Sequence, residues 1–327
     1  MLFSCTLLTG TTLIFFAPNW FTAWIGLEIN LYSFIPIMIN SSTTQQKEAS
    51  MKYFLAQAVG SGLLLIGTLA LTSFNSATLM ILMALLLKAG VAPFHFWFPS
   101  VMSALPWASC ILLSTTQKLG PALLIIQMFT PSALILMIIS SLSALVGGIG
   151  GLNQSQTRAI IAYSSIGHMG WVFGVSIINT PLSKLMLLNY MTTVTSIIIL
   201  LMMSTSKSSN QPMIPSDLSP LIKTMLVFLF MSLGGLPPFF GFFPKLFIIM
   251  ELMTNNFIKL SLFLILGSML NLYYYMKIMY TSFFSMPLKT SMFAKPLMKT
   301  TMFITLLMLS SAVIQLSLLI TFPWLSS

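Results

Sequence analysis

The chain has 327 residues, of which 57% are hydrophobic and only 6% are charged, with a formal net charge of +10. Soluble domains carry about 25% charged residues, so this composition excludes a soluble globular protein of this length. It also argues against a nucleic-acid-binding protein, because the basic residues lie mostly in short segments between apolar runs rather than on one polar face. A single integral membrane domain over residues 1–327 is predicted.

Eleven apolar segments follow one another, separated by Pro, Asn, Ser or charged residues, and most are close to the ~20 residues that a helix needs to span a bilayer. They cover residues 2–17, 21–39, 51–73, 77–98, 105–128, 132–151, 157–178, 182–203, 219–251, 258–285 and 300–322. The ninth is too long for one straight span, and a Gly-Gly-Leu-Pro-Pro sequence interrupts it. We therefore predict an all-α polytopic membrane protein with about eleven transmembrane helices.

The basic residues predict how the chain is oriented in the membrane. One face of the eleven-span arrangement carries Lys47, Lys52, Arg158, Lys207, Lys223, Lys289, Lys295 and Lys299 in or beside its loops. The opposite face has only Lys184 and Lys259. By the positive-inside rule, the N-terminus lies on the positive side and the C-terminus on the other.

Two interrupted segments resemble each other. The stretches GVAPFHFWFPS at 90–100 and GLPPFFGFFPK at 235–245 share Gly, Pro, Phe, Phe and Pro at a constant offset of 145 residues. The first lies in the fourth predicted span and the second in the ninth, so the two helices run in opposite directions. Such a pair is typical of inverted-repeat transporters, although two ordinary proline kinks are the alternative. We predict halves at 1–128 and 132–285, followed by a C-terminal helix at 300–322.

Each predicted break frees a backbone carbonyl at membrane depth. Pro93 has no N–H to donate to the carbonyl of Ala89, and Pro238 has none for that of Gly234. Because lipid supplies no hydrogen bonds, a freed carbonyl must meet protein or water. The breaks are therefore expected to face a polar interior.

Three lysines and one glutamate fall inside predicted spans, where a charged side chain costs about 2.5–3.5 kcal/mol on insertion scales. Lys88 and Lys118 lie too deep for their side chains to reach the interface. Lys245 follows the second break, and Glu28 is the only acid well inside a span. Lys88 is the natural partner of Glu28, because a lone buried carboxylate would protonate whereas a paired one can stay charged. All four are candidates for proton transfer.

His168 is a fifth candidate, because histidine gains or loses a proton near neutral pH; a hydrogen-bonded core histidine is the alternative. His95, beside the first break, is left open between these two interpretations. Glu251 and Lys277 lie near span ends and are interpreted as interface residues. The GGIGG sequence at 147–151 lacks the residues that follow a phosphate-binding loop and is interpreted as a helix-packing site.

Together the five candidates describe a proton path. Water between the three lysines and His168 would carry a proton along the membrane, and movement of Glu28 relative to Lys88 would change the charge state of that lysine. The sequence has no nucleotide-binding motif or haem ligand pattern, and Cys5 and Cys110 are isolated. The energy for transport is therefore expected to come from a partner or an ion gradient.

The stretches WIGLEINLYSFIPIM, LKAGVAPFHFWFP, TTQKLGP, RAIIAYSSIGHMGW and GGLPPFFGFFPK resemble the subunit 2 family of the NADH dehydrogenase of mitochondrial respiratory complex I. The resemblance covers nearly the whole chain. It implies that Glu28 and Lys88 form a modulating ion pair and that Lys118 is the central proton carrier. It also implies that Lys245 acts on the exit side and that His168 lies on the hydrophilic axis. One departure is Ser100, where some relatives carry an acid.

The same resemblance implies proton translocation coupled to NADH:ubiquinone oxidoreduction, an activity of the whole complex. No cofactor and no redox centre are expected in this chain; FMN, iron–sulfur clusters and ubiquinone would lie in other subunits. The implied partners are other complex I subunits, above all neighbouring antiporter-like ones, and membrane lipid such as cardiolipin. The implied location is the mitochondrial inner membrane, with the N-terminus in the matrix and the C-terminus in the intermembrane space. The sequence begins without an Arg-rich leader, as expected for synthesis inside the organelle.

Two other classes of function compete with this interpretation. One is a stand-alone cation/proton antiporter of the same fold, and the other is a purely structural membrane scaffold. A sodium antiporter is expected to use several intramembrane carboxylates as ion ligands, whereas this chain offers Glu28 as its one clear candidate. That shortage favours the complex I interpretation.

Overall fold

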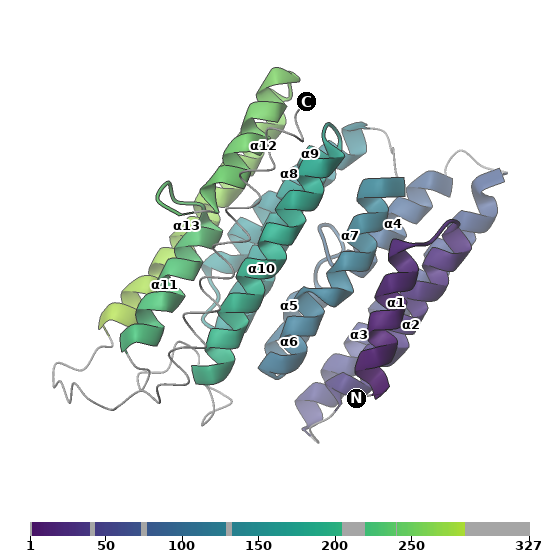
Figure 1. The fold of residues 1–327 in the computed structure, drawn as a ribbon, viewed down its shortest axis with the longest axis horizontal. Coiled ribbons are helices and arrows are strands. Elements are labelled where there is room, and N and C mark those ends of the chain that lie inside the picture. The colour runs from purple at the N-terminus through teal and green to yellow at the C-terminus, as the bar shows by residue number, and fades with distance from the viewer. Residues whose placement is uncertain are drawn as a thin grey trace.

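A computed structural model describes residues 2–39, 43–72, 77–128, 133–204, 220–239 and 241–284. Figure 1 shows the described helices as one bundle with roughly parallel axes, α1 to α7 on one side and α8 to α13 on the other. The helices are α1 Leu2–Phe15, α2 Trp20–Met38, α3 Thr44–Leu69, α4 Ala77–Ala89, α5 Trp97–Ala104, α6 Trp107–Ser114, α7 Thr116–Met128, α8 Ala133–Leu152, α9 Thr157–Ser176, α10 Thr180–Ser204, α11 Pro220–Gly234, α12 Phe242–Thr254 and α13 Ile258–Phe284, with a short 3-10 helix, η1 Ala70–Thr72.

The predicted all-α membrane fold is confirmed. Six helical stretches in the described part are long and apolar enough to cross a bilayer, and three shorter apolar helices accompany them. Each of the first ten predicted segments coincides with one helix or a consecutive pair. The eleventh segment, 300–322, and the loop residues Lys207, Lys289, Lys295 and Lys299 lie outside the described residues.

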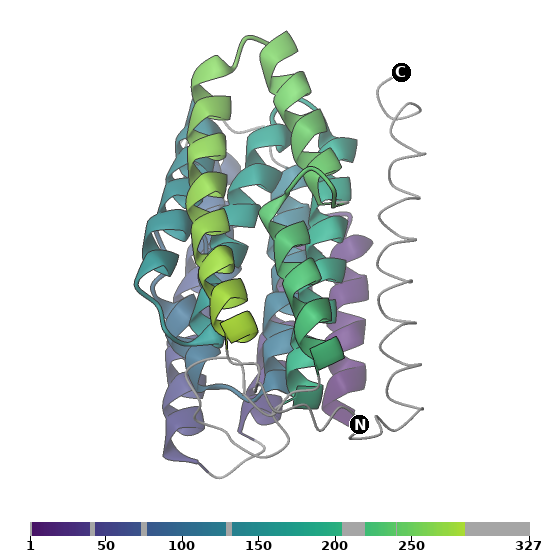
Figure 2. The ribbon, with the colours of Figure 1, turned by 90° about the vertical axis from the view of Figure 1, so that its left-hand side faces the viewer.

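The two predicted breaks are present and carry the same offset. The first separates α4 from α5, and the second separates α11 from α12, with both helix ends and both helix starts shifted by 145 residues. In Figure 1, α11 lies below α12 whereas α4 lies above α5, so the broken helices run in opposite directions. Figure 2 shows the loop between α11 and α12 partway along the bundle, beside α13.

The cause that we assigned to the breaks was wrong in one respect. Both α4 and α11 end in a Schellman motif, whose left-handed residue is glycine rather than proline. Gly90 has a φ of 66° and Gly235 a φ of 79°. The N–H of Gly90 donates to Leu87 and that of Val91 to Leu86; the N–H of Gly235 donates to Ser232 and that of Leu236 to Met231. Pro93 and Pro238 come after these caps, where proline prevents the helix from resuming.

Three boundaries differ from the prediction. The fourth span does not end at residue 98 but continues as α5 to Ala104, and α3 begins at Thr44 because its polar first turns are also helical. The fifth span is interrupted at Thr115, between α6 and α7. The hydroxyl of Thr115 donates to the carbonyl of Ile111 at 2.6 Å and that of Thr116 to Leu112 at 2.9 Å. Such back-bonding bends helices, so the consecutive hydroxyl residues were the signal that we missed.

Candidate functional site

The structure places Glu28 of α2 beside Lys88 of α4. The distance from Glu28 Oε1 to Lys88 Nζ is 3.5 Å, and the side chains are 13% and 1% exposed. Neither atom has a hydrogen-bond partner among the described residues. Gly60 of α3 leaves room for the lysine, because a Cβ there would lie 3.0 Å from Lys88 Cγ. The attraction that stabilises a buried ion pair of this kind depends on the distance between the charges, so small movements of either helix change it.

The last carbonyls of α4 receive side-chain donors from other helices. Gln57 of α3 donates to the carbonyl of Lys88 at 3.1 Å, and the indole N–H of Trp97 donates to that of Leu87 at 3.0 Å. The carbonyl that we expected to be freed here was that of Ala89; these donors reach the two carbonyls before it instead. The Lys88 side chain takes no part in this cap and points to Glu28 instead.

Lys118 lies in the first turn of α7, directly after the interruption at Thr115. Its side chain is buried, and Nζ donates to Ser165 Oγ of α9 at 2.7 Å. Nζ also lies 3.9 Å from the centroid of the Phe98 ring of α5. Lys118 forms no ion pair with an acid in the described part of the chain, so neutral groups hold it.

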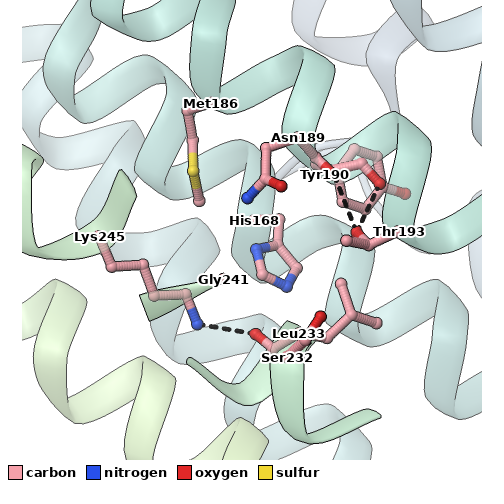
Figure 3. A pocket seen from close by; sticks show the side chains of 9 residues that line it. All are labelled: His168, Met186, Asn189, Tyr190, Thr193, Ser232, Leu233, Gly241 and Lys245. Carbon is pink, nitrogen blue, oxygen red and sulfur yellow. Dashed lines mark hydrogen bonds between the residues drawn. The ribbon is translucent and has the colours of Figure 1, made fainter. Parts of the chain in front are cut away.

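Lys245, in the first turn of α12, reaches back to the end of α11. Nζ donates to the carbonyls of Leu233 at 2.8 Å and Gly234 at 2.9 Å. Figure 3 shows the bond to Leu233. The ammonium therefore caps the carbonyls at the negative end of the α11 dipole. Gly235 makes the approach possible, since a Cβ there would lie 2.9 Å from Lys245 Cδ.

His168 of α9 faces the same region. Neither of its ring nitrogens has a partner among the residues that the structure describes. With Lys245 it lines a small cavity, whose other lining residues are Met186, Asn189, Tyr190, Thr193, Ser232, Leu233 and Gly241 (Figure 3). The cavity volume is about 10 Å³, close to the room that one water molecule needs. Several buried polar atoms without a protein partner line it, so the cavity suits water.

Tyr190 of α10 connects the two lysine environments, and our sequence reasoning missed it. Its ring centroid lies 5.5 Å from that of His168, and its buried hydroxyl lies near Ser165, the partner of Lys118, without a hydrogen bond among the described residues. Lys118 and Lys245 both lie within electrostatic range of His168. The order in space is therefore Lys118, Ser165, Tyr190, His168, cavity and Lys245. The cluster of Asn189, Tyr190, Thr192 and Thr193 in the middle of a predicted span was the signal that the sequence offered.

The remaining predicted residues lie outside this series. His95 is in the segment between α4 and α5, where Nδ1 lies 3.3 Å from the carbonyl oxygen of Pro93. Lys223, which we placed beside the loop before its span, lies in the first turn of α11 as that span predicts, but its side chain is buried. Lys277 is exposed and Glu251 is partly exposed. No group of three His, Cys, Asp or Glu residues in the described part could hold a metal ion.

The family described as "NADH:quinone oxidoreductase/Mrp antiporter, TM" matches residues 17–78 and 72–271. NADH-ubiquinone oxidoreductase chain 2 of Sylvisorex johnstoni is 37% identical over 286 residues, covering 84% of this chain and 82% of the relative. The same protein of Lumbricus terrestris is 40% identical over 282 residues, covering 84% and 83%. Matches of this extent establish the family.

Solved structures agree with the fold. A chain of respiratory complex I from Thermus thermophilus, solved with bound aureothin, has a TM-score of 0.78 at 22% identity, covering 94% of this chain and 75% of that one. A chain of the Mrp complex from Dietzia has a TM-score of 0.77 at 19% identity; the match covers 83% of this chain and spans 58% of the Dietzia chain. This chain belongs to the NADH:quinone oxidoreductase/Mrp antiporter transmembrane family and is similar along most of its length to NADH-ubiquinone oxidoreductase chain 2.

Proposed function

We propose that this chain is a proton-translocating subunit of the membrane arm of respiratory complex I, where it helps to couple NADH:ubiquinone oxidoreduction to proton pumping. The relatives named NADH-ubiquinone oxidoreductase chain 2 support the complex. One observation carries the role in proton transfer: the buried series from Lys118 through Ser165, Tyr190 and His168 to Lys245. A lipid-facing scaffold would have no use for cations at this depth.

In this proposal a proton leaves Lys118 Nζ for the Ser165 oxygen as the Ser165 hydroxyl passes its own proton on. That hydroxyl donates to the carbonyl of Ala162 at 2.6 Å, so it must first turn toward Tyr190. The Tyr190 hydroxyl relays the proton to His168, which can hold it on a ring nitrogen. Lys245 first releases its own proton, and its neutral amine leaves the carbonyls of Leu233 and Gly234; water in the cavity then passes the proton from His168 to that amine.

The Glu28–Lys88 pair modulates this path rather than lying on it. While the pair is closed, the carboxylate stabilises the lysine ammonium; when the pair opens, that stabilisation is lost and a proton can leave. The redox reaction supplies the drive. FMN, the iron–sulfur clusters and ubiquinone belong to other subunits in this proposal, and the neighbouring antiporter-like subunits and membrane lipid are the partners. The chain lies in the mitochondrial inner membrane with its N-terminus on the matrix side.

The test is proton uptake by the intact complex reconstituted in vesicles, measured together with NADH oxidation. Lys118→Met removes the titratable group and is expected to slow proton transfer through this chain by about 100-fold or more. Lys277→Met, an exposed lysine on α13, is the matched control and is expected to pump normally. Undiminished uptake with Lys118→Met would refute the role of Lys118. Purification of the chain as an active monomeric transporter would instead favour a stand-alone antiporter.

A further inference from the structure

The Lys118 ammonium sits on an aromatic ring. Its Nζ is 3.9 Å from the centroid of Phe98, and both residues are 1% exposed. A cation over an aromatic face is attracted by the ring quadrupole, and the attraction is stronger where water is excluded. Since the described acids do not reach Lys118, Phe98 and Ser165 are the groups that fix its position.

Phe98 belongs to the broken helix and packs against its break. It is the second residue of α5, and a Cβ on Gly90 would lie 3.0 Å from Phe98 Cβ. Gly90 is the left-handed residue that ends α4, with a φ of 66°. The ring under Lys118 therefore rests on the turn that follows Lys88 and Ala89.

Trp97 fixes Phe98 to the end of α4. Its indole N–H donates to the carbonyl of Leu87, the residue before Lys88, at 3.0 Å. Its ring meets that of Phe98 edge to face, with centroids 5.6 Å apart and planes at 89°. On another side it meets Tyr53 of α3 at 5.7 Å. One tryptophan thus contacts the helix end that carries Lys88 and the ring that supports Lys118.

The second break lacks this arrangement. The residues 145 positions after Trp97 and Phe98 are Phe242 and Phe243, which have no indole N–H to cap α11. The residue 145 positions after Lys118 is Phe263, exposed on α13. The contact between a lysine and the ring that begins the helix after the break is therefore specific to the first half. In the second half Lys245 lies over Trp171 of α9 instead, with Nζ 6.0 Å from the ring centroid.

We propose that Trp97 and Phe98 are positioning residues: Phe98 holds the Lys118 ammonium toward Ser165, and Trp97 ties Phe98 to the end of α4 beside Lys88. A shift of that helix end, as when the Glu28–Lys88 pair opens, then moves the ring and changes the surroundings of Lys118. This inference rests on the proposed function of Lys118.

The experiment compares aromatic and aliphatic residues at position 98 in the intact complex. Phe98→Leu and Phe98→Met keep an apolar side chain but remove the π face, and both are expected to lower proton uptake per NADH by about fivefold to tenfold. Phe98→Tyr keeps the face and is expected to stay within about twofold. Phe96→Leu is the matched control, because Phe96 is 78% exposed in the same segment. Trp97→Phe keeps a ring without the indole N–H and is expected to give an intermediate loss in a complex of unchanged assembly.

Normal pumping by Phe98→Leu and Phe98→Met would overturn the inference, and so would a loss in Phe98→Tyr as large as that in Phe98→Leu. If the position 98 variants do not assemble, normal pumping by assembled Trp97→Phe would overturn it. The two proposals fail differently. Normal pumping by Lys118→Met would refute the proposed function. Slow pumping by Lys118→Met together with normal pumping by the variants at positions 97 and 98 would refute only this inference.

Discussion

Replacing Gly235 with alanine perturbs the second break at a single backbone position. Gly235 has a φ of 79°, in the left-handed region that residues with a Cβ disfavour. The added methyl group would also lie 2.9 Å from Lys245 Cδ and 3.0 Å from Nζ. The lysine side chain is the mobile partner in that contact, so it is expected to yield. Gly235→Ala should therefore disturb both the cap of α11 and the position of Lys245.

Two contributions determine how much Gly235→Ala is expected to destabilise the protein. A left-handed backbone costs a residue with a Cβ about 1–2 kcal/mol. A hydrogen bond from a charged group is worth about 1.5–3 kcal/mol, and Lys245 is expected to lose one of its two carbonyl partners, Leu233 or Gly234. The variant should therefore be destabilised by about 2.5–5 kcal/mol, with slower proton uptake because Lys245 no longer borders the cavity correctly.

Gly234→Ala is the matched control. Gly234 is the last residue of α11 and has ordinary helical φ, and a Cβ there would meet Tyr275 at 3.5 Å, an ordinary contact. The assay is the temperature at which the solubilised complex loses its assembly, followed by proton uptake in vesicles. Gly235→Ala should fail at a lower temperature than wild type, and Gly234→Ala should not. Equal behaviour of the two variants would show that neither the left-handed backbone nor the Lys245 contact matters.

Glu28→Gln removes the counter-charge of Lys88 while keeping the shape of the side chain. Because breaking a buried pair costs about 3–5 kcal/mol of stability, less complex should assemble, and the complex that does assemble should pump more slowly. Glu48→Gln is its control, since the exposed Glu48–Lys52 pair contributes less than about 1 kcal/mol, and an equal loss in both would contradict the reasoning. Gly60→Val places a branched side chain against Lys88; the overpacking should destabilise the protein by about 1–3 kcal/mol and impair pumping. Gly62→Val is its control, because a Cβ at Gly62 has nothing within 4 Å, and it should have no effect on pumping or assembly.

The helices could be predicted from sequence because bilayer thickness fixes the length of an apolar span, and the polar residues between spans mark the ends. The polar first turns of α3 do not follow that rule: Thr44 to Ser50 are helical although hydropathy places them outside the membrane. The capping glycines were also visible in the sequence. Proline masked them, because a Gly-x-x-Pro sequence is compatible with a kink at the proline as well as with a cap at the glycine.

The contacts of Lys118 could not be predicted. Its partners Ser165 and Phe98, and Tyr190 near Ser165, come from three other helices, and the spacing of residues along one helix does not determine which neighbour it packs against. The Glu28–Lys88 pair was easier to predict, because Glu28 was the only acid well inside a span and therefore the only acidic partner for a buried lysine. Scarcity of buried charge, rather than geometry, made that part of the site predictable.

The two breaks show why a repeat in sequence does not imply a repeat in chemistry. Both helices end in the same glycine cap, and in both a side chain donates to the carbonyl of the residue two before that glycine, Lys88 or Leu233. In the first half the donor is the neutral Gln57, which leaves the Lys88 ammonium to pair with Glu28. In the second half the residues 145 positions after Gln57 and Glu28 are Met202 and Phe173, so that amide and that carboxylate do not recur in the repeat. Lys245 supplies the donor instead, and its charge is balanced by backbone carbonyls that cannot themselves take up a proton. The lysine of the first half therefore responds to an acid, while that of the second half responds to the geometry of the helix end.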